Sequence, residues 1–253
     1  MQELEFHGLR GFCFEHLQSN ADLRHVFAAR NDADVGNLAY SGGRDRQAAF
    51  AARSIWSQYL QVNPEHWVVG GQTHTAHVAV VEESHRGRGA LAPTEVLPNT
   101  DGLFTTCRGL PLYVAVADCS AVLLHAAGAL AVVHGGWRGL ADGILARAME
   151  RFQQHGVAPA EIQAAIAPCM QAASYEVGPE VAQACPASAK YPGRDDRWQV
   201  DIAKWASAEL LKAGIAEPQI EISGLDTGSD PRFFSHRRQG VGAGRNGLIA
   251  VLA

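Results

Sequence analysis

The sequence lacks an excess of positive charge, a long apolar run and a leader segment. It has 21 Lys and Arg residues against 26 Asp and Glu residues, which gives a formal net charge of −5. Because nucleic acids and anionic membrane surfaces attract basic proteins, we expect neither as a partner. No apolar run approaches the roughly 20 residues that span a bilayer, and the first residues lack the basic head and apolar core of a signal peptide. We therefore expect a cytoplasmic protein.

Cysteine is scarce, and its five positions form no closely spaced pair. An odd number of cysteines in a chain without a signal peptide argues for free thiols rather than for a disulfide framework. At least one thiol is therefore a candidate metal ligand or nucleophile. The cysteines are Cys13, Cys107, Cys119, Cys169 and Cys185.

Internal repeats, Ser/Gly-rich linkers and a dinucleotide-binding motif are also absent. No G-x-G-x-x-G follows a strand and opens a helix, so a Rossmann sheet has little support. The 47% of hydrophobic residues is enough for a substantial core. Strand-like and helix-like segments mix without a strict βαβ order. We expect an α+β fold, a single layered domain over 1–253 with mixed β-sheets flanked by helices.

Apolar spacing locates most of the expected elements. Apolar residues at helical intervals predict one helix early in the chain, one in the middle and one near the end. Short β-branched runs between turn residues predict the strands. The expected helices lie at 44–61, 138–156 and 201–214, with a short one after Gly178; the expected strands lie at 110–119, 121–125, 129–137, 161–169, 219–223 and 247–252, with two short pieces inside 67–82.

Three donors at the ends of predicted strands suggest a metal site. Cys119 and His134 interrupt stretches that otherwise read as buried sheet, and His74 lies in the polar turn between the two short strand pieces of 67–82. A catalytic zinc ion takes three such ligands and keeps one position open for water or substrate. The spacing is not that of a compact zinc finger, so the alternative is that each is a hydrogen-bonded core residue. His77 and His125 compete for the same role, although a solvated histidine at a turn is the ordinary explanation for His125.

Asp118 lies directly before Cys119 in the sequence. In an extended strand its carboxylate would point away from the metal side, because successive side chains alternate between the two faces. If the strand ends or bends there, the carboxylate could instead orient a ligand histidine or act as a general base.

Two basic segments could hold an anion. Arg138 follows Gly135 and Gly136 and opens a predicted helix, where the positive end of the helix favours an anion. Residues 232–247 combine four arginines, three of them candidates for anion binding, with four glycines between 240 and 247. Guanidinium groups and exposed amides suit phosphate or carboxylate. A solvated arginine and a basic loop with a helix cap are the ordinary alternatives. The three arginines are Arg237, Arg238 and Arg245.

Five motifs, in order along roughly residues 70–250, resemble the bacterial laccase-domain family. This family is also called the multicopper polyphenol oxidase or peptidoglycan editing factor family. The motifs are "QTHTAHV", "DGLFTTCRGLPLYVAVADCSAVLL", "VVHGGWRGLADGI", "IAPCMQAASYEVG" and "RFFSHRR". The resemblance implies that His74, Cys119 and His134 hold the metal, and it demotes His77 and His125.

The resemblance also implies an activity. Family members are similar to zinc-dependent enzymes that phosphorolyse adenosine, inosine, guanosine and methylthioadenosine and that deaminate adenosine. The expected cofactor is therefore Zn²⁺, with copper as the alternative metal, and the expected substrates are a purine nucleoside and phosphate. On this reading Asp118 is a proton carrier, and Arg30 helps the carboxy-terminal arginines to position phosphate.

A sixth, amino-terminal motif matches less well in "AARNDADVGNLAYSGG". Arg30 and Asn37 fit its arginine and asparagine, but the Gly-Gly between them is missing. The expected catalytic residues are then Asp118, Arg30 and Cys119, and the expected substrate-binding residues are Asn37, Arg138, Arg237 and Arg238.

Three other functions remain open. The older family name implies copper-dependent phenol oxidation, but blue-copper oxidases use several copper sites with His-x-His pairs; this chain has eleven histidines, no such pair and three methionines. Alternatively, Cys119 is a nucleophile and His134 its base in a hydrolase that edits peptidoglycan precursors. A noncatalytic metal-binding module is the last reading. The sequence leaves the oligomeric state open.

Overall fold

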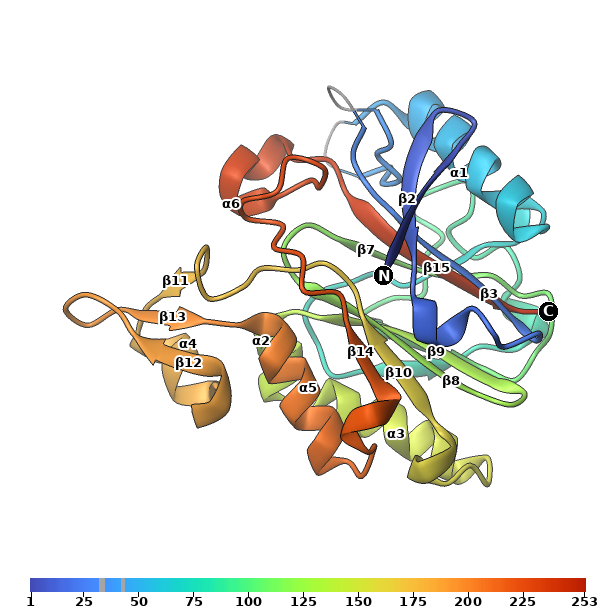
Figure 1. Ribbon diagram of the computed structural model, residues 1–253. Helices are drawn as coiled ribbons and strands as arrows, with labels where there is room; N and C mark the ends of the chain where they lie inside the picture. Colours follow the sequence, from blue (N-terminus) through green and yellow to red (C-terminus); the bar gives the residue numbers. More distant parts are fainter. Residues whose placement is uncertain (32–34, 42–43) are drawn as a thin grey trace.

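Two large mixed β-sheets lie against each other in the computed structural model, which describes residues 1–31, 35–41 and 44–253 (Figure 1). The first sheet has the order β1 (Gln2–Phe6), β2 (Leu9–Cys13), β3 (Leu23–Ala28), β15 (Asn246–Leu252), β7 (Leu112–Val116) and β4 (Val68–Val69). The second has the order β14 (Ile220–Ile222), β10 (Gln163–Ile166), β8 (Ser120–Ala126), β9 (Ala129–Gly135), β6 (Gly102–Thr105) and β5 (Val78–Val80). In each sheet most neighbours are antiparallel. The parallel pairs lie at the edges: β4 with β7 in the first sheet, and β5 with β6 and β14 with β10 in the second.

Helices cover the outer faces of both sheets. The helix α1 (Arg46–Leu60) lies on the first sheet, and α3 (Ile144–Gln154) and α5 (Ile202–Lys212) lie on the second. The remaining helices are α2 (Trp137–Ala141), α4 (Pro179–Ala184) and α6 (His236–Gln239). A small third sheet has the order β11 (Glu176–Val177), β13 (Trp198–Val200) and β12 (Lys190–Pro192). Short 3₁₀ turns lie at Glu15–Leu17, Pro64–His66, Glu83–His85, Pro159–Glu161, Ala187–Ala189, Glu217–Gln219 and Gly240–Gly242.

Alternation along β8 explains why both of its faces are apolar. Ala121 and Leu123 belong to the core between the two sheets, whereas Val122 and Leu124 belong to the core under α3 and α5. Because side chains alternate along a strand, a strand covered on both faces reads as a continuous apolar run. The α+β class with mixed sheets and flanking helices is thus confirmed.

One predicted helix is interrupted. The segment 138–156 forms the end of α2 and then α3, with a break at Gly143, whose φ of +82° is left-handed. A glycine adopts this conformation at little cost, so the chain changes direction there. The other end is as expected, because Gly156 follows α3 with a φ of +80°. The helix predicted after Asp201 is also confirmed, with the Asp201 side chain accepting a hydrogen bond from Lys204 N.

Two expectations from composition can be compared with the structure. All five cysteines are free thiols. Within the described ranges, none of the helices has the combined length and apolar character that a bilayer span needs.

The β8–β9 hairpin prepares the functional end of the second sheet. Ala121 pairs with His134 in its antiparallel register, and Ser120 pairs with Gly135. Cys119, the residue directly before β8, therefore lies beside the end of β9 that carries His134. Antiparallel pairing thus brings together two residues that the two strands and their short turn separate in the sequence.

Candidate metal centre

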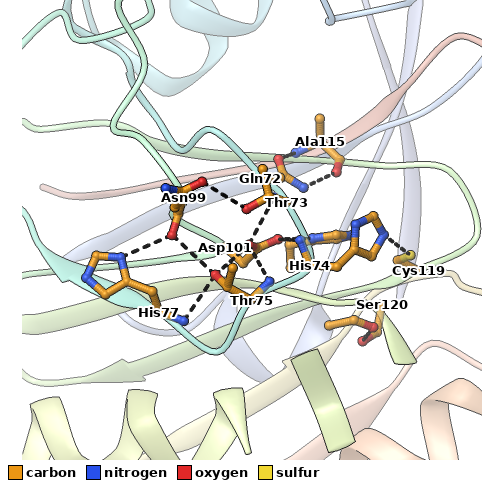
Figure 2. A network of polar contacts seen from close by, with 12 residues as sticks. Gln72, Thr73, His74, Thr75, His77, Asn99, Asp101, Ala115, Cys119 and Ser120 are labelled. Atoms are coloured by element: carbon orange, nitrogen blue, oxygen red, sulfur yellow. Dashed lines mark hydrogen bonds and ion pairs between the residues drawn. The ribbon is translucent and has the colours of Figure 1, made fainter. Parts of the chain in front are cut away.

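The structure brings the three predicted ligand residues together. The donor atoms of His74, Cys119 and His134 all lie within 4.8 Å of one another. Cys119 Sγ lies 4.0 Å from His74 Nε2 (Figure 2), and the two imidazole rings meet edge to face with centroids 4.9 Å apart. His74 is exposed, Cys119 is half-buried and His134 is buried. The cluster is therefore covered by protein on the His134 side and accessible to solvent on the His74 side.

Asp101 organises this cluster from behind (Figure 2). Its Oδ1 lies 2.7 Å from His134 Nδ1 and accepts a hydrogen bond from His74 N at 3.0 Å. Its Oδ2 accepts hydrogen bonds from Thr73 N, Thr75 N and Thr75 Oγ1. With the proton of His134 on Nδ1, its Nε2 is the atom that can bind a metal, which is the usual role of a carboxylate behind a ligand histidine.

Asp101 is a functional residue that the sequence analysis missed. It is completely buried and opens the motif "DGLF", but it was given no role there. The available signal was a carboxylate directly before the apolar run Gly-Leu-Phe of β6. A carboxylate buried there without hydrogen-bond partners would destabilise the fold, so partners should be expected. The histidine-orienting role that was open for Asp118 is thus filled by Asp101.

The charges in the cluster favour metal binding. Burial alone would raise the pKa of Cys119, but His134 and His74 outweigh it and lower that pKa to about 6. Burial alone would lower the pKa of His134, but Cys119 and Asp101 raise it to about 9. His134 and the hydrogen bonds to Asp101 also hold the pKa of Asp101 well below its usual range, against the effect of burial. A thiolate is the form of cysteine that binds metals, and metal binding would displace the proton of the imidazolium.

Backbone geometry at the cluster is unusual in two places. His74 has a φ of +64° and Asp118 a φ of +89°, both in the left-handed region. Non-glycine residues adopt it at a cost, and such strain is common where function fixes a side chain. Gly136 provides the necessary room, because a Cβ there would lie 2.6 Å from His74 Cδ2 and 3.4 Å from Cys119 Sγ.

The variant Gly136→Ala should weaken metal binding by about tenfold or more, because the new methyl group displaces the His74 ring from its position. Competition of a chromogenic chelator for the metal measures the effect. Gly242→Ala is the matched control, since a Cβ there meets nothing within 4 Å. Equal metal affinity in both variants would contradict the assignment of His74 as a ligand.

Asp118 lies at the bend between β7 and β8. Its Oδ1 accepts a hydrogen bond from Thr227 Oγ1 at 2.8 Å, and its Oδ2 accepts one from Arg237 N at 2.7 Å. Its backbone carbonyl accepts a hydrogen bond from Met170 N. The carboxylate therefore ties the start of α6 to the metal loop. A role for Asp118 in proton transfer stays a prediction.

A cavity of about 840 Å³ opens beside the cluster. Pockets for small organic ligands usually have volumes of about 300–1,000 Å³. Its lining includes three arginines and, among the described lining residues, one carboxylate, so the cavity is positive although the whole chain is acidic. Apart from the metal cluster, the charged or hydrogen-bonding residues used below are Tyr40, Arg53, Tyr113, Asp118, Arg237 and Arg245.

Of the predicted anion-binding residues Arg237, Arg238 and Arg138, one lines the cavity and two do not. Arg237 lines the cavity, and its Nη1 donates a hydrogen bond to the carbonyl of Glu176. Arg238 lies outside the lining and donates to the carbonyl of Phe233 at 2.6 Å. Arg138 is exposed and lies over the ring of its neighbour in α2, 4.3 Å from the ring centroid. Only the first of these three therefore meets the cavity in this conformation.

The amino-terminal candidates also lie outside the cavity lining. Arg30 donates a hydrogen bond to a backbone carbonyl at 3.5 Å. Asn37 Oδ1 accepts a hydrogen bond from Arg245 N at 2.9 Å, so it positions a cavity arginine through the backbone. Residues 32–34 and 42–43 of the same motif lie outside the described residues. The substrate-binding roles of these two residues stay predictions.

The competing histidines do not join the cluster. His77 Nδ1 lies 3.2 Å from the carbonyl of Asn99. His125 Nε2 lies 3.2 Å from Asp22 Oδ1, and the ring is buried rather than solvated as expected. Its place within β8, under the end of the hairpin, explains the burial.

Comparison with known proteins gives relatives over most of the chain. A purine nucleoside phosphorylase of Corynebacterium glutamicum is 33% identical, with 91% of this chain and 95% of that protein covered. An adenosine deaminase from an unknown prokaryotic organism is 30% identical, with 91% and 92% covered.

Solved structures with the same fold match nearly the whole chain. The crystal structure of YlmD from Geobacillus stearothermophilus has a TM-score of 0.91 and 26% identity and covers all of this chain and 98% of that one. The Bacillus licheniformis hypothetical protein YfiH has a TM-score of 0.90 and 25% identity, with 97% and 96% covered. A family model described as "Multi-copper polyphenol oxidoreductase laccase" matches residues 23–253. With a match over nearly the whole chain, the protein belongs to this laccase family, as its five motifs predicted.

Proposed function

We propose that the protein is a zinc-dependent purine nucleoside enzyme. Its reactions would be the phosphorolysis of adenosine, inosine, guanosine and methylthioadenosine and the deamination of adenosine. The observation that carries the proposal is the cluster of His74, Cys119 and His134 at the wall of a positive cavity that is large enough for a nucleoside. The names of the relatives from Corynebacterium glutamicum and from the unknown prokaryote support both reactions.

The donor set fits zinc. One thiolate and two imidazoles are borderline-soft ligands, and the Asp101 carboxylate behind His134 is the support that such a ligand needs. Zinc held by three protein ligands polarises an oxygen at its open position. Copper accepts the same ligand types, so the identity of the metal belongs to the proposal.

The residues of the chain would supply positioning and proton transfer. Deamination replaces the exocyclic amine of adenosine with oxygen from water and releases ammonia, so one proton must reach the leaving amine. Asp118 is the carboxylate in the described cavity lining, and each of its oxygens has a single hydrogen bond and a further lone pair. It is therefore the candidate proton carrier.

Phosphorolysis needs a different arrangement. An oxygen of phosphate forms a bond to the anomeric carbon of the ribose while the bond to the purine nitrogen breaks, and the purine leaves with the electron pair and takes up a proton. Arg237, at the cavity wall, would offset part of the charge of the phosphate. Arg30 remains a proposed catalytic residue, and Asn37, Arg138 and Arg238 remain proposed substrate-binding residues. Each side chain would have to move toward the cavity to contact a ligand there.

Incubation of the zinc-loaded protein with adenosine, with and without phosphate, tests the proposal. Chromatography should show free adenine only when phosphate is present, and inosine without phosphate. Neither product at any phosphate concentration would contradict the proposed function.

The other readings are outcomes of further arms of the same experiment. The described residues contain one cluster of metal-binding type, whereas a multicopper oxidase needs several copper ions. Oxygen uptake with a phenol would favour phenol oxidation. Processing of a cell-wall precursor by metal-free protein would favour Cys119 as a nucleophile with His134 as its base.

A further inference from the structure

A buried arginine without an acidic partner lines the cavity away from the metal cluster. Arg53, on α1, has 2% of its surface exposed. Its Nε donates a hydrogen bond to the carbonyl of Leu38 at 2.9 Å, and its Nη1 donates to the carbonyls of Gly89 and Ala90. No carboxylate in the described part of the chain pairs with it. A buried charge of this kind needs compensation. The three carbonyls and the ring faces of Tyr40, Trp67 and Tyr113 stabilise it but supply no opposite charge.

Two tyrosines flank the same guanidinium. Its central carbon lies 3.9 Å from the ring centroid of Tyr40 and 5.0 Å from that of Tyr113. Both tyrosines line the cavity, and their buried hydroxyl groups lie close to Arg53, which can only donate, so neither O–H has an acceptor among the described residues. Buried polar groups usually have partners, so two neighbouring exceptions beside a cavity indicate a missing ligand.

Both hydroxyls keep their protons at neutral pH. Burial raises the pKa of Tyr113 to about 12 and also raises that of Tyr40. They are therefore hydrogen-bond donors beside a permanent positive charge. A cationic ligand group would be repelled by such a set, whereas an anion gains from both its charge and its acceptor oxygens.

The position of Tyr113 is set by the sheet. Its ring lies across Gly247 of β15, where a Cβ would collide with the ring. Arg245, two residues earlier, lines the same cavity, and its Nη1 donates to the carbonyls of Ala243 and Gly244. This arginine adds a second positive charge to the same lining.

We propose that Tyr40, Arg53, Tyr113 and Arg245 form an oxyanion-binding subsite in the cavity, separate from the metal cluster. A planar guanidinium, a second cation and two phenol donors match the charge and the acceptor oxygens of a phosphoryl group. Tyr113 lies three residues before the end of β7, which corresponds to about 10 Å of strand. One bound nucleoside therefore has room between the subsite and the metal ligands.

The source of the oxyanion rests on the proposed function. It is either inorganic phosphate, the second substrate of phosphorolysis, or a phosphoryl group carried by the nucleoside itself. A solely structural role for Arg53 explains its bonds to carbonyls, but it leaves the O–H groups of Tyr40 and Tyr113 without an acceptor among the described residues.

Calorimetric titration of the zinc-loaded protein tests the subsite. One arm uses inorganic phosphate and the other a nucleoside 5′-monophosphate. We expect Tyr113→Phe and Tyr40→Phe each to weaken binding of the favoured oxyanion by about tenfold or more, because each removes one hydrogen bond to a charged group. Both variants should fold normally, since neither lost hydroxyl donates a hydrogen bond to a described residue and Arg53 keeps its three carbonyl acceptors. Tyr59→Phe is the control, since its hydroxyl lies 3.3 Å from Cys13 Sγ and outside the cavity lining.

Failure of the subsite and failure of the proposed function give different results. Oxyanion binding that weakens in the Tyr113 variant, without any nucleoside turnover, supports the subsite and contradicts the enzyme activity. Phosphorolysis with an unchanged KM for phosphate in that variant, together with unchanged binding of the monophosphate, overturns the subsite alone. Absence of binding of either oxyanion to the unaltered protein also overturns it.

Discussion

The variant Asp101→Asn should bind its metal about 10- to 100-fold more weakly than the unaltered protein, the usual effect of removing the carboxylate behind a ligand histidine. Metal-free, it should lose about 1–3 kcal/mol of unfolding free energy, because the change removes one of the two anions, beside the Cys119 thiolate, that stabilise the buried His134 imidazolium. The asparagine keeps the size of the side chain but offers one acceptor oxygen in place of two.

Two measurements separate these effects. Chelator competition gives the metal affinity, and urea unfolding of the metal-free protein gives the free energy. Asp196→Asn is the matched control, because Asp196 is exposed and its nearest cation is Arg197 at 3.4 Å. If Asp101→Asn retains both the metal affinity and the stability of the control, then Asp101 does not support the cluster.

The variant Cys119→Ser should lose nearly all bound zinc and nearly all activity on nucleosides. The Cys119 thiol has a pKa lowered to about 6 by the two histidines, whereas a serine hydroxyl stays protonated and is a poor zinc ligand. Elemental analysis after gel filtration measures the metal, and product chromatography measures the activity.

Cys107→Ser is the control for this substitution. Cys107 is also a free, half-buried thiol, but it lies outside the cluster and the cavity lining. This variant should keep stoichiometric metal. Full activity in Cys119→Ser protein that contains no metal would contradict a metal-dependent mechanism.

The ligand set could be predicted from the sequence because Cys119 and His134 lie at the ends of apolar runs and His74 lies in a polar turn between two short ones. His74, Cys119 and His134 were proposed on that basis together with the family motifs, and the structure gathers them. Asp101 was missed because a single acidic residue before a strand is also typical of an ordinary turn. Four of its five hydrogen bonds come from the loop 73–75 and the fifth joins it to His134, and no local pattern indicates that these segments meet at Asp101.

The cavity was less predictable than the metal cluster. Arg53 looks like a polar position on an amphipathic helix, and its burial depends on the segments around Leu38 and Gly89 that cover it. Tyr40 and Tyr113 look like ordinary core aromatics in the sequence, because nothing local indicates that they line a cavity. Local periodicity carries no information about which distant loops meet, so the substrate side of the site needed three-dimensional structure.

The strands that periodicity missed are short or weakly patterned. The amino-terminal hairpin turns at His7 and Gly8, both with positive φ, but its second strand contains a glycine. The strands of the small third sheet have two or three residues, too few to show alternation. The organisation of the chain as a single domain stays a prediction, supported by the pairing of β15 with both β3 and β7.

The cluster joins parts of the chain that are far apart in sequence. His74 precedes β5, whereas Cys119 directly precedes β8 and His134 lies near the end of β9. A bound metal would therefore act as a removable cross-link. Unlike a disulfide, it would be present only in the folded chain, where the three donors meet, and its stabilisation would rise and fall with the concentration of free metal. The Asp101 carboxylate connects the same segments through hydrogen bonds, so folding can bring the ligands together before the ion arrives.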